Sequence, residues 1–213
     1  MNKEKFEKLY KEFQDTLIED PLVVTFDDEF YKRCDTFISL LQQWGKIHNL
    51  TASLSTSDIE ENILDSIYPL AFIDAFKSFA DVGTGAGYPG MLLAIARPDI
   101  KAVLIEARVK RVAFLNFVKS ALKLNNLEII KSRVEDVELE TFDLVTSRAV
   151  TNTSLLLDLT SNISDENTSY LFYKGSLCQD EIKDAKVQNF KVKKIGEHRN
   201  YLYIQKKGLI NGN

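Results

Sequence analysis

Phe79-Ala-Asp-Val-Gly-Thr-Gly-Ala-Gly-Tyr-Pro-Gly90 is the stretch that decides the fold. It opens with an apolar run at 79–82 that is typical of a buried strand. The three glycines that follow, at 83, 85 and 87, predict a sharp turn, because glycine adopts backbone angles that other residues avoid and lets a ligand approach closely. Pro89 suits the first turn of a helix. The stretch therefore predicts a strand, a ligand-binding loop and a helix in succession.

Strand-like and helix-like segments alternate along the rest of the chain. Helical patterns separate or follow the apolar runs, and their alternation predicts a parallel sheet. The last two runs are joined by only five residues, too few for a parallel crossover, so they must pair antiparallel. We predict a Rossmann-like α/β fold, with a mostly parallel sheet and a reversed terminal strand. The predicted strands are 79–82, 102–105, 127–130, 142–146, 170–173, 190–195 and 201–204, and the predicted helices are 89–96, 110–124 and 154–163.

The first 77 residues have a different pattern of apolar residues. Aromatic and aliphatic side chains recur there at helical spacing, and only Gly45 interrupts them. Ser57-Asp-Ile-Glu60 has the pattern of a capping box and predicts the start of a third helix. We expect a helical cap over 1–77, an α/β domain over 78–207 and a tail over 208–213.

Composition excludes several classes of protein. The chain has 213 residues, 45% of them hydrophobic and 27% charged, which is ordinary for a globular protein. Two cysteines and two histidines exclude a disulfide framework and a zinc site of the usual Cys/His type, and we expect no metal. We see no apolar run of the roughly 18 residues that a membrane helix needs and no secretory signal. These features predict a cytoplasmic protein without a membrane partner.

Charge is distributed unevenly along the chain. The net charge is −4, yet residues 97–213 hold 19 basic against 15 acidic side chains, whereas residues 1–96 hold 8 against 16. Basic residues gather at 108–111, 131–133 and 191–194. Each cluster is either a solvated surface or part of a rim that contacts phosphates, which needs only a local positive field.

The glycine loop alone leaves two classes of enzyme open. Gly85, Gly87 and Gly90 fit the dinucleotide pattern G-x-G-x-x-G, and Glu106 ends the next strand where an acid that binds a ribose is expected. A NAD-dependent oxidoreductase and an S-adenosylmethionine-dependent methyltransferase share these features. Asp81, which lies inside the strand before the first glycine, and the reversed terminal strand favour a class I methyltransferase.

Several motifs in order make the chain resemble one family, the glucose-inhibited division protein B family of small-subunit ribosomal RNA guanine-N7 methyltransferases. The resemblance runs from about residue 44 to residue 174. Asn62 departs from it, because the family usually has histidine at this position. The matching motifs are Trp44-Gly-Lys-Ile-His-Asn-Leu-Thr51, Asn62-Ile-Leu-Asp-Ser66, Asp81-Val-Gly-Thr-Gly-Ala-Gly-Tyr-Pro-Gly90, Lys110-Arg-Val-Ala-Phe-Leu115, Thr146-Ser-Arg-Ala149 and Lys174-Gly175.

The resemblance implies a cofactor, a substrate and a set of site residues. The cofactor is S-adenosyl-L-methionine, and the substrate is a guanine in the 530-loop region of 16S ribosomal RNA, either free or in the small ribosomal subunit. We expect the protein to be a monomer. Residues expected to bind the cofactor are Gly83, Gly85, Gly87, Tyr88, Glu106, Val134, Glu135 and Arg148; those expected to bind the substrate are His48, Asn49 and Arg133; and those expected to act in catalysis are Arg148 and Lys174.

Guanine N7 methylation suits the residues that are present. N7 carries an in-plane lone pair and no proton, so the reaction needs neither a general base nor a cysteine nucleophile. Arg148 and Lys174, at the ends of successive predicted strands, are expected to position the cofactor or the guanine O6 atom. His48 and Asn49 either wall the guanine pocket or form a structural turn. A non-catalytic RNA-binding assembly factor with the same fold remains an alternative.

Overall fold

A computed structural model describes residues 1–17, 24–197 and 199–205. Its centre is a seven-stranded sheet in the order β3-β2-β1-β4-β5-β7-β6. The first five strands are parallel, and β7 runs antiparallel to both β5 and β6. The strands are β1 (Ser78–Val82), β2 (Lys101–Ile105), β3 (Leu127–Ile130), β4 (Leu144–Arg148), β5 (Ser169–Lys174), β6 (Phe190–Ile195) and β7 (Arg199–Ile204).

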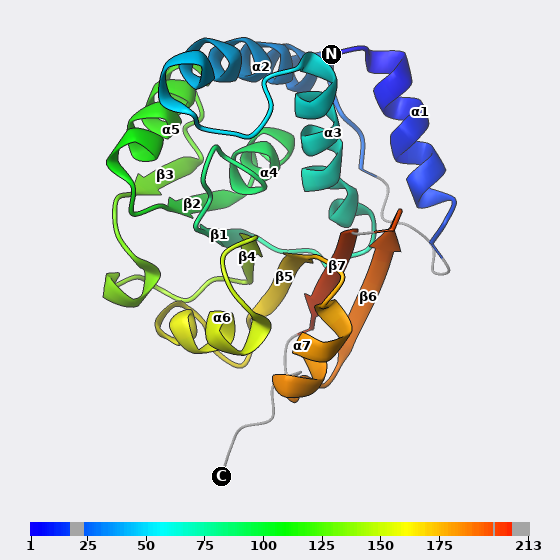
Figure 1. Ribbon diagram of the computed structural model, residues 1–213, viewed down its shortest axis with the longest axis vertical. Coiled ribbons are helices and arrows are strands. Elements are labelled where there is room, and N and C mark those ends of the chain that lie inside the picture. Colours follow the sequence, from blue (N-terminus) through cyan, green and yellow to red (C-terminus); the bar gives the residue numbers. More distant parts are fainter. Residues whose placement is uncertain (18–23, 198, 206–213) are drawn as a thin grey trace.

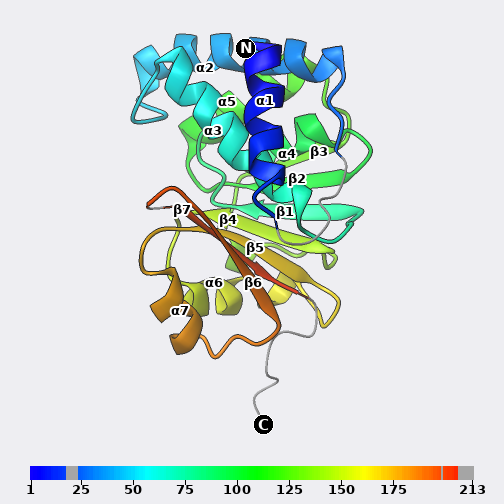
Figure 2. The same cartoon turned by 90° about the vertical axis from the view of Figure 1, so that its right-hand side faces the viewer.

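Helices cover both faces of this sheet (Figures 1 and 2). One face carries α1 (Lys3–Gln14), α2 (Asp28–His48), α3 (Thr56–Ile67), α4 (Gly90–Ala96) and α5 (Val109–Leu122). The other face carries α6 (Thr153–Leu159) and α7 (Cys178–Asp184). Short 3-10 turns complete the order at Tyr68–Ala71, Val134–Asp136 and Ser161–Ile163.

Side chains along each strand point alternately to the two faces of the sheet, so the hydrophobic core has two parts. In β5, Leu171 and Tyr173 point toward the large cluster formed with the N-terminal helices, whereas Tyr170 and Phe172 point toward α6 and α7. All four side chains are almost fully buried. A strand buried on both faces in this way reads as a continuous apolar run, which is why the sequence reveals the central strands clearly.

The N-terminal helices are not an independent layer. Phe13 of α1 stacks on Tyr68 at 4.5 Å between ring centroids, and Tyr201 of β7 lies edge-on to Phe13 at 6.5 Å. These rings join the helices to the last strand across most of the sequence. The proposed division at residues 77 and 78 therefore stays a prediction of the sequence, since both sides share one hydrophobic cluster.

The predicted α/β fold with a mostly parallel sheet and a reversed last strand is confirmed. The reversed strand lies inside the sheet, between β5 and β6, rather than at its edge. The cap of the third helix was predicted wrongly: Ser55, not Ser57, accepts from the backbone N–H of Asp58 at 3.1 Å. The strand predicted at 142–146 begins two residues later and ends at Arg148. The tail at 208–213, with residues 206 and 207, lies outside the described residues.

Candidate cofactor and substrate site

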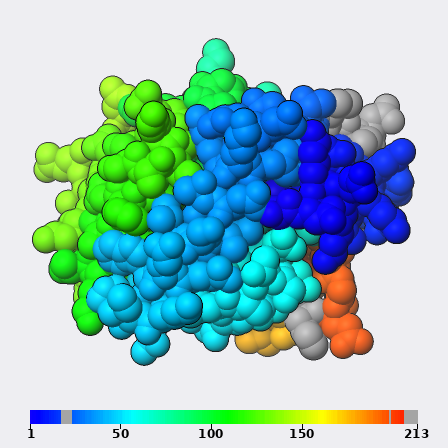
Figure 3. All heavy atoms as spheres, turned by 90° about the horizontal axis from the view of Figure 1, so that it is seen from above, coloured from blue at the N-terminus to red at the C-terminus, as the bar shows by residue number. Residues whose placement is uncertain are grey.

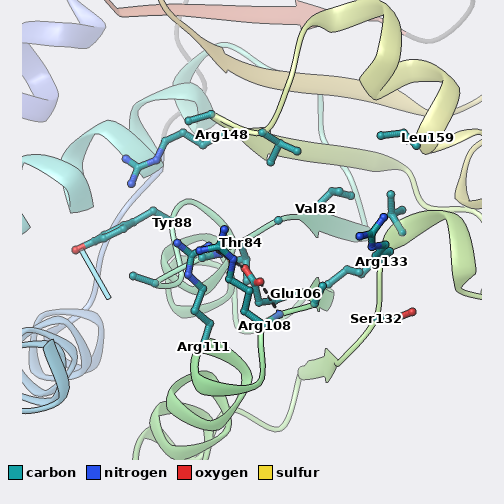
Figure 4. A pocket seen from close by; sticks show the side chains of 18 of the residues that line it. Val82, Thr84, Tyr88, Glu106, Arg108, Arg111, Ser132, Arg133, Arg148 and Leu159 are labelled. Carbon is teal, nitrogen blue, oxygen red and sulfur yellow. Dashed lines mark hydrogen bonds and ion pairs between the residues drawn. The ribbon is translucent and has the colours of Figure 1, made fainter. Parts of the chain in front are cut away.

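A cavity of about 530 Å³ opens at the carboxyl ends of β1, β2 and β4 (Figure 4). Its size falls within the roughly 300–1,000 Å³ of small-molecule sites. Ligands of open α/β sheets bind at this edge, where the strand order reverses. The cavity is lined by Leu50, Thr51, Val82, Gly83, Thr84, Gly85, Ala86, Tyr88, Ile105, Glu106, Ala107, Arg108, Arg111, Ser132, Arg133, Val134, Glu135, Arg148, Ala149, Val150 and Leu159.

The glycine loop forms the floor of the cavity. Gly83 and Gly85 have φ of +68° and +61°, a region that favours glycine. A Cβ on Gly83 would lie 2.5 Å from a methyl carbon of Val150, so this position must stay bare for the segment after β4 to pack beside the loop. A Cβ on Gly85 would meet nothing closer than 3.7 Å, where the Arg111 side chain lies. The space above Gly85 is therefore open to a ligand.

Gly87 allows close packing of α4 and does not line the cavity. Its φ is +100°, and a Cβ there would lie 2.9 Å from the Cβ of Met91 in α4. Gly90 is similar, because a Cβ on it would lie 2.2 Å from a methyl carbon of Leu104 and 2.6 Å from the Cβ of Asp81. These two glycines let α4 pack closely on β1 and β2. Gly87 was expected to bind the cofactor, but it is not among the residues that line the cavity.

Asp81 ties the loop to the neighbouring elements. Its carboxylate is fully buried and accepts from the N–H of Gly90 at 3.0 Å and from the hydroxyl of Thr146 at 2.8 Å. Burial raises the pKa of Asp81 to about 6, and the two hydrogen bonds oppose a further rise. Asp81 thus holds the start of α4 against β4 and does not line the cavity.

Glu106 is the central acid of the cavity. Its side chain is 4% exposed and accepts from the backbone N–H of Gly85 at 3.0 Å and from that of Arg108 at 2.9 Å. The Arg111 guanidinium lies 3.4 Å away (Figure 4). Oε2 accepts from both Gly85 and Arg111, whereas Oε1 accepts from Arg108 alone and can accept one further hydrogen bond. This arrangement suits the binding of a ribose hydroxyl.

Three further expected residues come from the segment after β3. Val134 is buried, and its carbonyl accepts from the Asn162 side chain at 2.8 Å. Arg133 and Glu135 flank it, with 3.8 Å between their charged groups. All three line the cavity, and Figure 4 shows Arg133 on the side opposite Tyr88 and Arg148.

Arg148 is held in one orientation by α3. Its guanidinium donates to the side-chain oxygen of Asn62 at 2.8 Å and to Asp65 at 3.2 Å. It lies over the ring of Tyr88, 4.6 Å from the centroid. Asp65 also accepts from the hydroxyl of Tyr201 at 2.7 Å, which fixes the carboxylate itself. Asn62, which stands where the resembled family usually has histidine, therefore serves as an acceptor for Arg148.

Lys174 lies elsewhere than the sequence led us to expect. Its ammonium is 2.7 Å from the carboxylate of Glu181 and donates to the carbonyl of Thr151 at 2.9 Å. Glu181 in turn accepts from the N–H and the hydroxyl of Thr153, at 2.8 and 2.9 Å. Burial acts to raise the pKa of Glu181, but Lys174 and Thr153 outweigh it and the pKa is lowered. Lys174 does not line the cavity; it fastens the segment between β4 and α6 that does.

His48 and Asn49 lie at the end of α2, beside the cavity but not in its lining. Asn49 has φ of +48° and caps the helix with its N–H to the carbonyl of Gly45 at 3.2 Å. The His48 ring lies 5.5 Å from that of Trp44. The turn delivers the next two residues, Leu50 and Thr51, into the lining.

Sequence reasoning missed some members of the site. Arg111 was seen only as part of a basic cluster, although the motif Lys110-Arg-Val-Ala-Phe-Leu115 marked it. Asn62 and Asp65 were not given a role, although their spacing of three residues places them on one face of a helix. Thr51 ended a quoted motif without being assigned to the cavity.

Comparison with known proteins identifies the family. The family model for rRNA small subunit methyltransferase G matches residues 31–207, a range that contains every residue lining the cavity. The chain belongs to this family.

Relatives cover most of the chain. It is 62% identical to the ribosomal RNA small subunit methyltransferase G of Aliarcobacter butzleri over 185 residues, which is 87% of this chain and 94% of the relative. It is 45% identical to that of Wolinella succinogenes over 76% of this chain and 83% of the relative. The methyltransferase G family thus accounts for the motifs in their observed order.

Solved structures agree with the fold. A putative O-methyltransferase from Klebsiella pneumoniae matches with a TM-score of 0.57 at 11% identity, over 97% of this chain and 99% of that one. The O-methyltransferase TomG from Streptomyces achromogenes, solved with S-adenosylmethionine, matches with a TM-score of 0.55 at 14% identity over 97% and 99%. Among the described residues, no helix is both long and apolar enough to cross a bilayer.

Proposed function

We propose that this protein transfers a methyl group from S-adenosyl-L-methionine to N7 of a guanine in the 530-loop region of 16S ribosomal RNA. The observation that carries the proposal is the match to the methyltransferase G family across all the residues that line the cavity. The protein acts in the cytoplasm as a monomer, on 16S ribosomal RNA or on the small ribosomal subunit.

The cavity has the chemistry that the cofactor needs. The bare loop at Gly85 admits the backbone approach of a ligand, and Glu106 Oε1 offers an acceptor for a ribose hydroxyl. Val134 and Glu135 form the wall where an adenine fits, and Arg148 supplies a cation for the carboxylate of the amino-acid end. The bound cofactor supplies a methyl group on a positively charged sulfur.

Methyl transfer to N7 moves charge but no proton. The N7 lone pair forms the new bond to the methyl carbon, the carbon–sulfur bond breaks and its electron pair stays on sulfur. The positive charge passes from sulfur to the purine ring. No side chain has to remove a proton, so the task of the protein is to align donor and acceptor, an effect worth roughly 7–11 kcal/mol at best.

Arg148 and Lys174 divide this task in our proposal. Arg148 lines the cavity, and its guanidinium is held in a fixed position by Asn62 and Asp65. Lys174 is a positioning residue: through Thr151 and Glu181 it holds the segment that carries Ala149 and Val150. The ammonium of Lys174 is thereby kept away from a ring that becomes cationic during the reaction.

Two measurements test the proposal against its alternatives. A melting temperature that rises with S-adenosylhomocysteine but not with NAD supports a methyltransferase, because a ligand that binds the folded state stabilises the protein. Transfer of labelled methyl from S-adenosylmethionine to small subunits that lack the modification excludes a non-catalytic assembly factor. Stabilisation by NAD alone, or binding of RNA without methyl transfer, would contradict the proposal.

A further inference from the structure

A surface beside the cavity carries exposed apolar side chains on two segments whose sequences contain no acidic residues. Ile47 at the end of α2 is 75% exposed and Phe117 of α5 is 45% exposed. Trp44 lies three residues before Ile47 on α2, and its ring is 5.4 Å from that of Phe117. We call Trp44, Ile47 and Phe117 the α2–α5 platform. Figure 3 looks onto this face, where the blue atoms of α2 and the green atoms of α5 lie side by side.

The platform lies in the positively charged part of an acidic protein. Neither residues 36–57 nor residues 107–127 contain a single aspartate or glutamate, although the chain as a whole has 31. Exposed Lys46 lies on the same helix end as Ile47, and exposed Arg108 and Lys110 stand at the start of α5. A local field of this sign attracts phosphates even when the net charge is negative.

The platform is continuous with the cavity. Leu50 and Thr51, which follow α2, line the cavity, and so do Arg108 and Arg111 at the start of α5. Phe117 lies nine residues beyond Arg108, about 14 Å along the helix at 1.5 Å per residue. A polymer that delivers one unit into the cavity can therefore lay its neighbouring units over the platform.

We propose that the α2–α5 platform binds the single-stranded RNA segment next to the target guanine, with bases stacked on Phe117 and Trp44 and phosphates near Lys46, Arg108 and Lys110. The inference rests on the proposed function. Proteins read unpaired RNA by stacking splayed bases on aromatic rings while basic side chains follow the backbone. A double helix offers no free base faces, so the platform favours single strands. A folded protein partner would not require the acid-free surroundings.

Trp44 is the only tryptophan of the chain and gives a direct readout. The test uses the full-length protein without cofactor and a 12-nucleotide single-stranded RNA of mixed sequence, at low and at high salt. We expect the RNA to quench the emission of Trp44 in a saturable way. The duplex of the same sequence should bind at least ten-fold more weakly.

Variants of Phe117 test whether bases stack on the platform. Phe117→Ala should weaken binding of the single strand about ten-fold, which corresponds to about 1.4 kcal/mol, and Phe117→Tyr should retain it. Phe190→Ala is the matched control, because Phe190 is 40% exposed but lies on β6 at the opposite end of the sheet. It should bind like the unmodified protein. All three variants should keep their affinity for S-adenosylhomocysteine.

Three results would overturn the inference. The first is that the duplex binds as tightly as the single strand. The second is that Phe117→Ala and Phe190→Ala bind the single strand equally. The third is a dimer in sedimentation that Phe117→Ala dissociates, which would make the platform a contact between copies. If only the platform proposal is wrong, the unmodified protein and Phe117→Ala transfer methyl groups at the same rate. If the proposed function is wrong, neither form transfers methyl groups.

Discussion

Glu106 offers the sharpest test of the cofactor site, through the substitutions Glu106→Ala and Glu106→Gln. The carboxylate is 4% exposed, accepts two backbone hydrogen bonds and faces the cavity. If it also binds the ribose through Oε1, its loss removes a hydrogen bond to a charged group, worth about 1.5–3 kcal/mol. One such bond corresponds to a dissociation constant about 10- to 150-fold higher.

The two substitutions separate binding from folding. Glutamine keeps one acceptor but turns an amide N–H toward a backbone N–H, so Glu106→Gln should also lower the free energy of unfolding by about 1–3 kcal/mol. Alanine leaves room for water to reach the N–H groups of Gly85 and Arg108, so Glu106→Ala should cost less stability. Both should bind the cofactor weakly.

Calorimetry with S-adenosylhomocysteine on folded protein is the assay, and circular dichroism checks the fold. Asp136→Asn is the control, because Asp136 is a nearby exposed acid outside the cavity lining. It should change affinity by less than two-fold. The reasoning is refuted if Glu106→Ala and Glu106→Gln bind the ligand as tightly as this control does.

Three further predictions concern the residues that support the site. Gly90→Ala should cost about 1–3 kcal/mol of stability by overpacking, since its Cβ would lie 2.2 Å from Leu104; an unchanged urea midpoint would contradict the close packing of α4. Asp81 has a pKa of about 6 when folded against 3.8 ordinarily, so the folded state retains a proton that the unfolded state has lost. Stability from this group should therefore fall as pH rises from about 4 to 6, and Asp81→Asn should remove that part of the slope in urea titrations; parallel slopes would count against it. Lys174→Met should lower the free energy of unfolding by roughly 1–3 kcal/mol, because it leaves Glu181 without its cationic partner, and it should also weaken cofactor binding. Adding Glu181→Gln should restore part of the stability. A double variant that is no more stable than Lys174→Met would show that loss of the ion pair is not the cause.

The sequence predicted the sheet and the loop because each depends on local pattern. Buried parallel strands such as β2 are continuous apolar runs, and a turn like that at Gly83 needs glycine whatever surrounds it. Glu106 was also foreseen, since a residue that ends a strand beside this loop must face the cavity.

Side-chain partners across the fold could not be predicted in the same way. Lys174 follows a strand just as Arg148 does, yet Glu181 of α7 captures it, and Arg148 instead meets Asn62 of α3. These partners are 7 and 86 residues away, and the sequence contains many carboxylates and amides at similar distances. Which of them is reached depends on how α3 and α7 dock on the sheet.

Ribosomal RNA itself gives the most direct test of the central claim. RNA from cells with and without this protein can be cleaved reductively at N7-methylguanosine and the cut mapped along 16S ribosomal RNA. We expect one cut in the 530-loop region that disappears when the protein is absent and returns when it is supplied again. A cut that persists without the protein, or one that disappears at another position, would contradict it.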